Sequence, residues 1–328
     1  MSSRCVFMSA GGDPFIALFA LKLFQERWYD EVDTFYICYN NHCGVPQDAV
    51  EEFKATVAKD PKVKLIYFPT GIGNGRPIAE MTKVATESYI MLLEDDGFIF
   101  TPGTVDKCFK RIEEGEVDAV GSPRFACGFE VSKLLKQKYK LDYSGEGDQG
   151  PNFWPCFFFC QRGHLLGTDM NFGSYSFEKG KYYKELAGEI TKDGEYGDTF
   201  VWACIQLRHL KLKFGTVPQK HASPYEFDDK LNSKGNWVSP IEWIHGGSLS
   251  TSWGGYLSGA KPDFTNDFGK QEIETRVAFW IICMENTAGF ENFKKDYHDG
   301  IENLIHDSQL DWERIRLKID IYRELMRI

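Results

Sequence analysis

The chain of 328 residues has no uncharged apolar run near the ~20 residues that a membrane-spanning helix needs. Its first residues, MSSRCVFMSAGGDP, lack the basic segment and apolar stretch of a secretion signal, so we expect a cytoplasmic protein. The nine cysteines contain no CxxC pair, and several stand in apolar runs. This pattern favours reduced, buried thiols over a zinc or redox site.

Runs of lysine or arginine are also missing, and the formal net charge is -10. A nucleic-acid acceptor is therefore disfavoured, because nonspecific attraction to a phosphate backbone needs positive charge. The glycine-rich stretch GIGNGR (71–76) matches neither the phosphate loop ending in Gly-Lys-Ser/Thr nor the GxGxxG fingerprint. What the chain does have is 42% hydrophobic and 15% aromatic residues, enough for a sizeable core and for a cleft that stacks against flat rings.

The first 120 residues alternate between strand-like and helix-like patterns with short connections. This alternation predicts an α/β fold, a Rossmann-like and mainly parallel sheet flanked by helices, with ligands bound outside the carboxyl ends of the strands. The predicted strands cover 4–9, 33–39, 62–68, 89–93 and 117–122, and the predicted helices cover 14–28, 46–59, 76–88 and 104–114.

Further along, the pattern predicts a mobile loop over 142–153, a buried strand at CFFFC (156–160), a helix over 198–210 and a strand over 211–217. From residue 263 the pattern is amphipathic and helical to residue 328. These C-terminal helices also suggest a surface for a homo-oligomer.

The strongest chemical signal is LLEDDGFIF (92–100), where an apolar strand ends in Glu94, Asp95 and Asp96. Three adjacent acids repel one another unless a divalent cation neutralises them, and hard ions such as Mg²⁺ and Mn²⁺ prefer carboxylate oxygen. A solvated turn after a strand is the alternative.

This strand, its acidic cluster and the Pro-initiated helix that follows (TPGTVDKCFKRI, 101–112) resemble the Asp-X-Asp region of GT-A glycosyltransferases of the family 2 type. The resemblance covers roughly residues 4–250. It implies that Asp96 binds a Mn²⁺ or Mg²⁺ ion directly, and that Glu94 or Asp95 contacts the donor ribose, the sugar or a metal-bound water.

Upstream loops resemble the nucleotide site of the same enzymes. The segment 68–85 places Gly71, Gly73, Gly75 and Arg76 between a strand and a helix, where glycine lets backbone amides approach a ligand. A plain turn, with Arg76 in a surface salt bridge instead of on a phosphate, is the alternative.

The first strand ends at Ser9 and Ala10, before Asp13, and the second ends near Asn40. The resemblance implies that these loops hold base and ribose. The family more often has an acid where Asn40 stands, which leaves the base open. For Asp13 a helix cap is an equal alternative.

Residues 192–214 resemble the region where inverting GT-A enzymes carry a catalytic acid at a helix start. Such an acid takes the proton from the acceptor hydroxyl. Asp198 is the first candidate and Glu195 the alternate, while an ordinary N-cap is the structural explanation of Asp198.

A late glycine-containing segment, SPIEWIHGGSLSTSWGG (239–255), carries His245. Many GT-A enzymes take a third metal ligand from such a loop, and the neighbouring glycines suit a lid over a diphosphate. His221 is the competing candidate.

The resemblance thus implies a metal-dependent glycosyltransferase that moves a sugar from a nucleotide-sugar, with UDP as the first nucleotide to consider, to a glycan or other hydroxyl acceptor. It divides the chain into a catalytic domain (1–262), with a nucleotide half (1–122) and an acceptor half (123–262), and a helical segment (263–328). A sugar-phosphate nucleotidyltransferase and a noncatalytic carbohydrate-binding protein are the alternatives. The former usually has a basic residue in the loop after its first strand, which SAGGDPF lacks.

Overall fold

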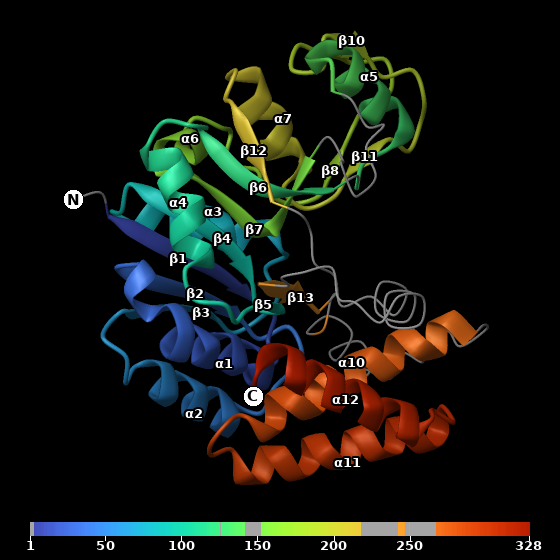
Figure 1. Cartoon of the computed structure of the whole chain (residues 1–328). Helices are drawn as coiled ribbons and strands as arrows, with labels where there is room; N and C mark the ends of the chain where they lie inside the picture. The colour runs from blue at the N-terminus through green and yellow to red at the C-terminus, as the bar shows by residue number, and fades with distance from the viewer. Residues whose placement is uncertain (1–2, 125, 142–151, 218–241, 247–248, 250–266) are drawn as a thin grey trace.

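A seven-stranded sheet forms the centre of the molecule, in the order β12-β6-β7-β4-β1-β2-β3 (Figure 1). The computed structural model describes residues 3–124, 126–141, 152–217, 242–246, 249 and 267–328. Neighbouring strands are parallel except that β7 runs antiparallel to both β4 and β6. The predicted mainly parallel sheet with flanking helices is confirmed.

The sheet strands are β1 (Arg4–Ala10), β2 (Thr34–Asn40), β3 (Val63–Phe68), β4 (Tyr89–Glu94), β6 (Ala119–Arg124), β7 (Asn152–Gln161) and β12 (Phe214–Thr216). The helices are α1 (Pro14–Leu23), α2 (Gln47–Val57), α3 (Gly75–Val84), α4 (Thr104–Glu113), α5 (Phe129–Tyr139), α6 (Arg162–Leu166), α7 (Val201–His209), α10 (Asp267–Glu285), α11 (Glu291–Asp307) and α12 (Trp312–Met326). Shorter strands are β5 (Gly97–Ile99), β8 (Tyr175–Ser176), β9 (Tyr182–Tyr183), β10 (Gly188–Glu189), β11 (Tyr196–Gly197) and β13 (Trp243–His245).

Helices cover both faces of the sheet, which is why its central strands read as continuous apolar runs. All seven residues of β2 are buried. One core joins the sheet to α1, α2 and α4, and a second core on the opposite face joins it to α3 and α7. Alternate residues of β1 contribute to the two cores, with Val6 and Met8 in the first and Cys5 and Phe7 in the second.

The C-terminal helices belong to the first of these cores. Nine of the ten residues of α1 are buried, because α10 to α12 lie over its outer side (Figure 1). Phe15 of α1 contacts Tyr297 of α11 edge-to-face, with ring centroids 4.8 Å apart. Phe98 of β5 stacks on Phe279 of α10 at 5.5 Å. The helices predicted after residue 263 are therefore packed directly against the sheet domain.

A separate small lobe contains α5 and the ribbons β8–β11 and β9–β10, at the upper right of Figure 1. Val131 and Tyr183 of this lobe belong to a third apolar cluster, which the lobe shares with Trp202 of α7. None of these short elements was predicted from the sequence.

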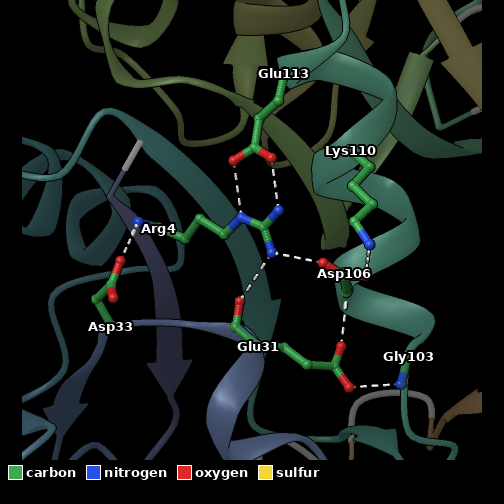
Figure 2. Close-up of polar contacts among 7 residues, drawn as sticks. All are labelled: Arg4, Glu31, Asp33, Gly103, Asp106, Lys110 and Glu113. Atoms are coloured by element: carbon green, nitrogen blue, oxygen red, sulfur yellow. Dashed lines mark hydrogen bonds and ion pairs between the residues drawn. The ribbon is translucent and has the colours of Figure 1, made fainter. Parts of the chain in front are cut away.

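At the amino end of the sheet, Arg4 joins three segments of the chain (Figure 2). Its guanidinium donates twice to the carboxylate of Glu113, at 2.8 and 2.6 Å, and once to Asp106 at 2.9 Å. These bonds raise the pKa of Arg4 despite its partial burial. Glu31 completes the network, because its two carboxylate oxygens accept from Gly103 N and Asp106 N, which begin α4.

Three predicted helices have clearly different bounds. The helix expected over 76–88 ends at Val84, because Ala85 is extended. The helix expected over 14–28 ends as an α-helix at Leu23 and continues as one π-type turn over Phe24–Trp28. The helix expected over 198–210 starts at Val201, because Phe200 takes a left-handed conformation that α-helix cannot continue through. The predicted loop over 142–153 lies mostly outside the described residues. No described helix is long and apolar enough to cross a membrane.

Candidate active site

The candidate site lies where the carboxyl ends of β1, β2 and β4 meet at one edge of the sheet. Register places Ser9 of β1 beside Glu94 of β4, and Ala10 beside Tyr39 of β2. A cavity of about 120 Å³ opens at this edge. Its lining residues are Ser9, Ala10, Gly11, Asn40, Asn74, Pro77, Glu94, Asp95, Asp96, Trp154, Asp198, Thr199 and His245.

The three acids at the end of β4 have different surroundings. Asp95 and Asp96 are buried, whereas Glu94 is partly exposed to the cavity. An oxygen of Asp95 accepts from Gly11 N at 2.7 Å, so Asp95 holds the loop after β1. Asp96 instead accepts from Leu249 N at 3.1 Å. The acidic cluster therefore ties two distant loops to the end of β4.

His245 completes the cluster. Strand β13 pairs antiparallel with β5 and places His245 opposite Gly97. Nε2 of His245 lies 3.2 Å from an oxygen of Asp96 and 3.4 Å from an oxygen of Glu94. Burial lowers the pKa of His245, but the charges and hydrogen bonds of the two acids outweigh it and raise the pKa to about 10. The imidazolium thus carries positive charge between them at neutral pH.

These side chains fit a divalent cation. Carboxylate oxygens from Glu94 and Asp96 and a ring nitrogen from His245 converge from separate segments, and such mixed oxygen and nitrogen sets suit Mn²⁺. A sulfur joins them, because ligand atoms of Glu94, Cys156 and His245 all lie within 4.8 Å of one another. Asp96 and His245, the two metal ligands named from the sequence, are brought together. His221 lies outside the described residues.

The two candidate bases differ sharply. Asp198 lines the cavity, where its Oδ1 accepts from Thr199 N at 2.7 Å and lies 3.5 Å from the hydroxyl oxygen of Ser174. Glu195 is buried, and its Oε2 accepts from Glu130 N and Val131 N, both at 3.0 Å. Glu195 therefore caps the N-terminus of α5 and is outside the cavity lining, which corrects its place as alternate base.

Of the residues predicted to contact the nucleoside, some line the cavity and one is buried away from it. Ser9 and Ala10 line the cavity, and Asn40 does so while donating to Ala10 O at 2.8 Å. Asp13 is fully buried: one oxygen caps α1 through Phe15 N at 2.9 Å, and the other accepts from Tyr297 OH at 2.5 Å. The cap alternative for Asp13 is the one that the geometry supports, so Asp13 is left out of the donor contacts proposed below.

The glycine-rich loop before α3 borders a second cavity, of about 600 Å³, that shares Asn74 and Thr199 with the first. Gly75 allows α3 to begin against the opposite loop, because a Cβ there would lie 2.0 Å from Gly173 N. Gly73 has a φ of +74°, which favours glycine. Arg76 is exposed at the rim with its Nε 3.8 Å from Glu80, a weak surface pair that leaves it within reach of a ligand.

Five lining residues of the first cavity were not among the candidates from the sequence: Gly11, Asn74, Pro77, Trp154 and Thr199. Trp154 of β7 lies beside the ring of His245, with centroids 5.1 Å apart. Thr199 and Asn74 lie at the junction of the two cavities. Proximity of Thr199 to Asp198 in the sequence was a usable signal. Trp154 and Cys156 gave none, because only the antiparallel insertion of β7 brings them beside β4.

No protein-family model matches the chain, and no curated protein matches it. Solved structures with similar folds include residues 1–349 of S. aureus TarS, at 11% identity over 99% of this chain and 90% of that chain, with a TM-score of 0.41. A mannosyltransferase of Pyrobaculum calidifontis, solved with GDP-Man and Mn²⁺, is 12% identical over 99% of this chain and 86% of that chain, with a TM-score of 0.45.

The galactosyltransferase LgtC, solved with donor and acceptor sugar analogs, is 13% identical over 89% of this chain and 99% of that chain, with a TM-score of 0.45. At such identities and TM-scores the likeness decides nothing about the reaction.

Proposed function

We propose that the chain is a metal-dependent glycosyltransferase that transfers a sugar from a nucleotide-sugar to a hydroxyl acceptor. One observation carries the proposal: a cluster of two carboxylates and an imidazole borders the same cavity as a separate carboxylate. Glu94, Asp96 and His245 form the cluster, and Asp198 is the carboxylate. Such a cavity can hold the diphosphate of a donor at one end and an acceptor hydroxyl at the other.

The donor half of the cavity is formed by the loops after β1 and β2. Ser9 and Asn40 offer a hydroxyl and an amide for ribose or base, and Asp95 fixes the first of these loops through Gly11 N. Arg76, at the rim of the adjoining cavity, is a candidate for a phosphate contact. The resemblance to GT-A enzymes makes UDP-sugars the first donors to test.

Bound Mn²⁺ or Mg²⁺ would neutralise charge on the leaving diphosphate. Glu94, Asp96 and His245 would hold this ion, and the burial of His245 and Asp96 keeps water from most of the cluster. The ring of Trp154 lies against the ring of His245 on one side of the cluster.

Asp198 is the proposed general base. The acceptor oxygen forms a bond to the anomeric carbon as the bond from that carbon to the phosphate oxygen breaks, and the acceptor proton passes to the carboxylate of Asp198. Thr199 N–H holds Oδ1 of Asp198 at the cavity wall. Attack from the side opposite the leaving group inverts the anomeric configuration.

The products of an incubation with nucleotide-sugars test the proposal. With Mn²⁺ and a panel of UDP- and GDP-sugars, NMR should show slow hydrolysis to nucleoside diphosphate and free sugar without an acceptor. With an acceptor present, nucleoside diphosphate should be released faster and the sugar should appear in a glycoside. Formation of nucleoside triphosphate and sugar 1-phosphate on addition of pyrophosphate would instead indicate a nucleotidyltransferase. Binding of a sugar without turnover of any donor would indicate a carbohydrate-binding protein. A glycoside with the donor's anomeric configuration would remove Asp198 as general base.

A further inference from the structure

A cysteine that reads as an ordinary core thiol in the sequence lies beside the acidic cluster. Strand β7 pairs antiparallel with β4, with Phe158 opposite Leu92. Because the two strands are antiparallel, Glu94, two residues after Leu92, and Cys156, two residues before Phe158, reach the same edge of the sheet. The sulfur of Cys156, a carboxylate oxygen of Glu94 and a ring nitrogen of His245 lie within 4.8 Å of one another.

The donor atoms in this group are chemically mixed. Cys156 is fully buried and His245 is 4% exposed, so both are largely shielded from water, whereas Glu94 reaches the cavity. Thiolate is a soft ligand, and sets of sulfur, nitrogen and oxygen donors favour Zn²⁺ and Co²⁺ over Mg²⁺. Sets of oxygen donors alone favour Mg²⁺ and Mn²⁺. A sulfur at this position therefore changes which ion the cluster prefers.

We propose that Cys156 is a direct ligand of the metal centre, which binds thiophilic divalent ions through Glu94, Cys156 and His245. As the ion enters, bonds form to the sulfur and to the ring nitrogen, and the thiol and ring protons pass to solvent. This inference rests on the proposed metal centre and deepens it by naming the class of ion. Zn²⁺ and Co²⁺ bind more tightly than Mg²⁺.

Cys160 provides a matched control within the same strand. Like Cys156 it is fully buried, but it packs in the core on the opposite face of the sheet and pairs with Ile90. Four residues of extended strand separate the two thiols by roughly 13 Å. Cys160→Ser therefore introduces the same buried hydroxyl without touching the metal centre.

The test is a titration of the full-length chain with Co²⁺, which reports thiolate ligation through a sulfur-to-cobalt charge-transfer band in the near ultraviolet. The native chain and Cys160→Ser should develop the band at one equivalent of metal. Cys156→Ser and Cys156→Ala should lack it. Absence of the band from the native chain, whether or not Co²⁺ binds, or its survival in Cys156→Ser overturns the proposal.

Calorimetry with Zn²⁺ and Mn²⁺ separates this inference from the proposed function. Loss of second-shell partners weakens metal binding by about 10–100-fold, so loss of a direct sulfur ligand should weaken Zn²⁺ binding by at least ~10-fold in Cys156→Ser. Mn²⁺-dependent binding of UDP should change much less in that variant. Unchanged Zn²⁺ affinity contradicts ligation by Cys156 while leaving the glycosyltransferase proposal standing.

Discussion

At the scale of single residues, two carboxylates only three positions apart have different tasks. Asp198 lines the cavity, and the N-cap position of α7 is occupied by Phe200, so the ordinary N-cap explanation of Asp198 does not hold. Glu195 caps α5 through two backbone amides. Replacement of Asp198 should therefore affect turnover, whereas replacement of Glu195 should affect stability.

We expect Asp198→Asn to keep UDP affinity and stability while turnover falls by about 10²–10⁴-fold, the usual contribution of a positioned base. Glu195→Ala should instead lower the free energy of unfolding by about 0.5–2 kcal/mol, the usual cost of a lost cap. Steady-state kinetics and urea unfolding of both variants measure this. Full turnover in Asp198→Asn contradicts the assignment.

A second residue-scale prediction concerns Asp13. Burial raises the pKa of Asp13 to about 6, although its hydrogen bonds from Tyr297, Phe15 and Ile16 act in the opposite direction. The folded state therefore binds a proton on the Asp13 carboxyl more tightly than the unfolded state does. Protonation of Asp13 thus stabilises the fold at pH 4, and this stabilisation is lost as pH rises through 6.

Asp13→Asn should remove this loss, because the amide oxygen still caps α1 and does not titrate in this range. Between pH 4 and pH 7, the free energy of unfolding of the native chain should fall by on the order of 1–3 kcal/mol relative to that of the variant. Urea unfolding at several pH values measures both profiles. Parallel profiles would show that Asp13 has an ordinary pKa.

At the scale of secondary-structure elements, the strands of the first half were predictable, because a strand buried on both faces is a continuous apolar run in the sequence. Strand β2 is a run of buried residues bounded by polar ones. The ribbon of β8 and β11 pairs only two residues from each strand, and Glu195 anchors α5 from a distant loop. Contacts of this kind produce no periodic pattern in the sequence, so β8, β11 and α5 were not predicted.

The site shows the same division. The acids that end β4 follow one another in the sequence and could be recognised there. Trp154 and Cys156 join them only through the pairing of β7 with β4, which the sequence does not display. The acids at the end of β4 were therefore predictable from the sequence, whereas the residues that β7 contributes were not.

A prediction at this scale concerns the start of α4. Gly103 is its N-cap and offers no side chain, and Glu31 supplies the missing acceptors to Gly103 N and Asp106 N (Figure 2). Glu31→Ala should cost about 0.5–2 kcal/mol of unfolding free energy. Replacing the exposed Glu114 at the other end of α4 should change stability by less than about 0.5 kcal/mol. Equal effects, measured by thermal unfolding, would show that Glu31 is not a cap.

At the scale of the whole molecule, the sheet domain and the C-terminal helices share one core. The division at residue 262 and the use of these helices in a homo-oligomer stay predictions. Phe98 of β5 and Phe279 of α10 stack across that division. A shared core requires energetic coupling across the division.

A double-mutant cycle between Phe98→Ala and Phe279→Ala measures this coupling. The free energy of unfolding of each single variant should fall by about 3–5 kcal/mol. Because the two rings touch, the loss in the double variant should differ from the sum of the single losses by about 0.5–3 kcal/mol. Phe214, which belongs to the core on the other face, serves as control, and its replacement should add to Phe279→Ala within about 0.5 kcal/mol. An additive Phe98 and Phe279 pair would mean that the C-terminal helices fold as an independent unit.

The central claim is that the cluster at the end of β4 binds a nucleotide through a metal ion, and calorimetry with UDP tests it most directly. Asp96→Asn is the informative variant, because it keeps an acceptor for Leu249 N but removes the charge. Asp193→Asn, at an exposed ion pair with Lys179, is its control. We predict that UDP binds the native chain and Asp193→Asn in Mn²⁺, and binds at least ~10-fold more weakly in EDTA or with Asp96→Asn. Equal UDP affinity in Mn²⁺, in EDTA and in Asp96→Asn would contradict the account.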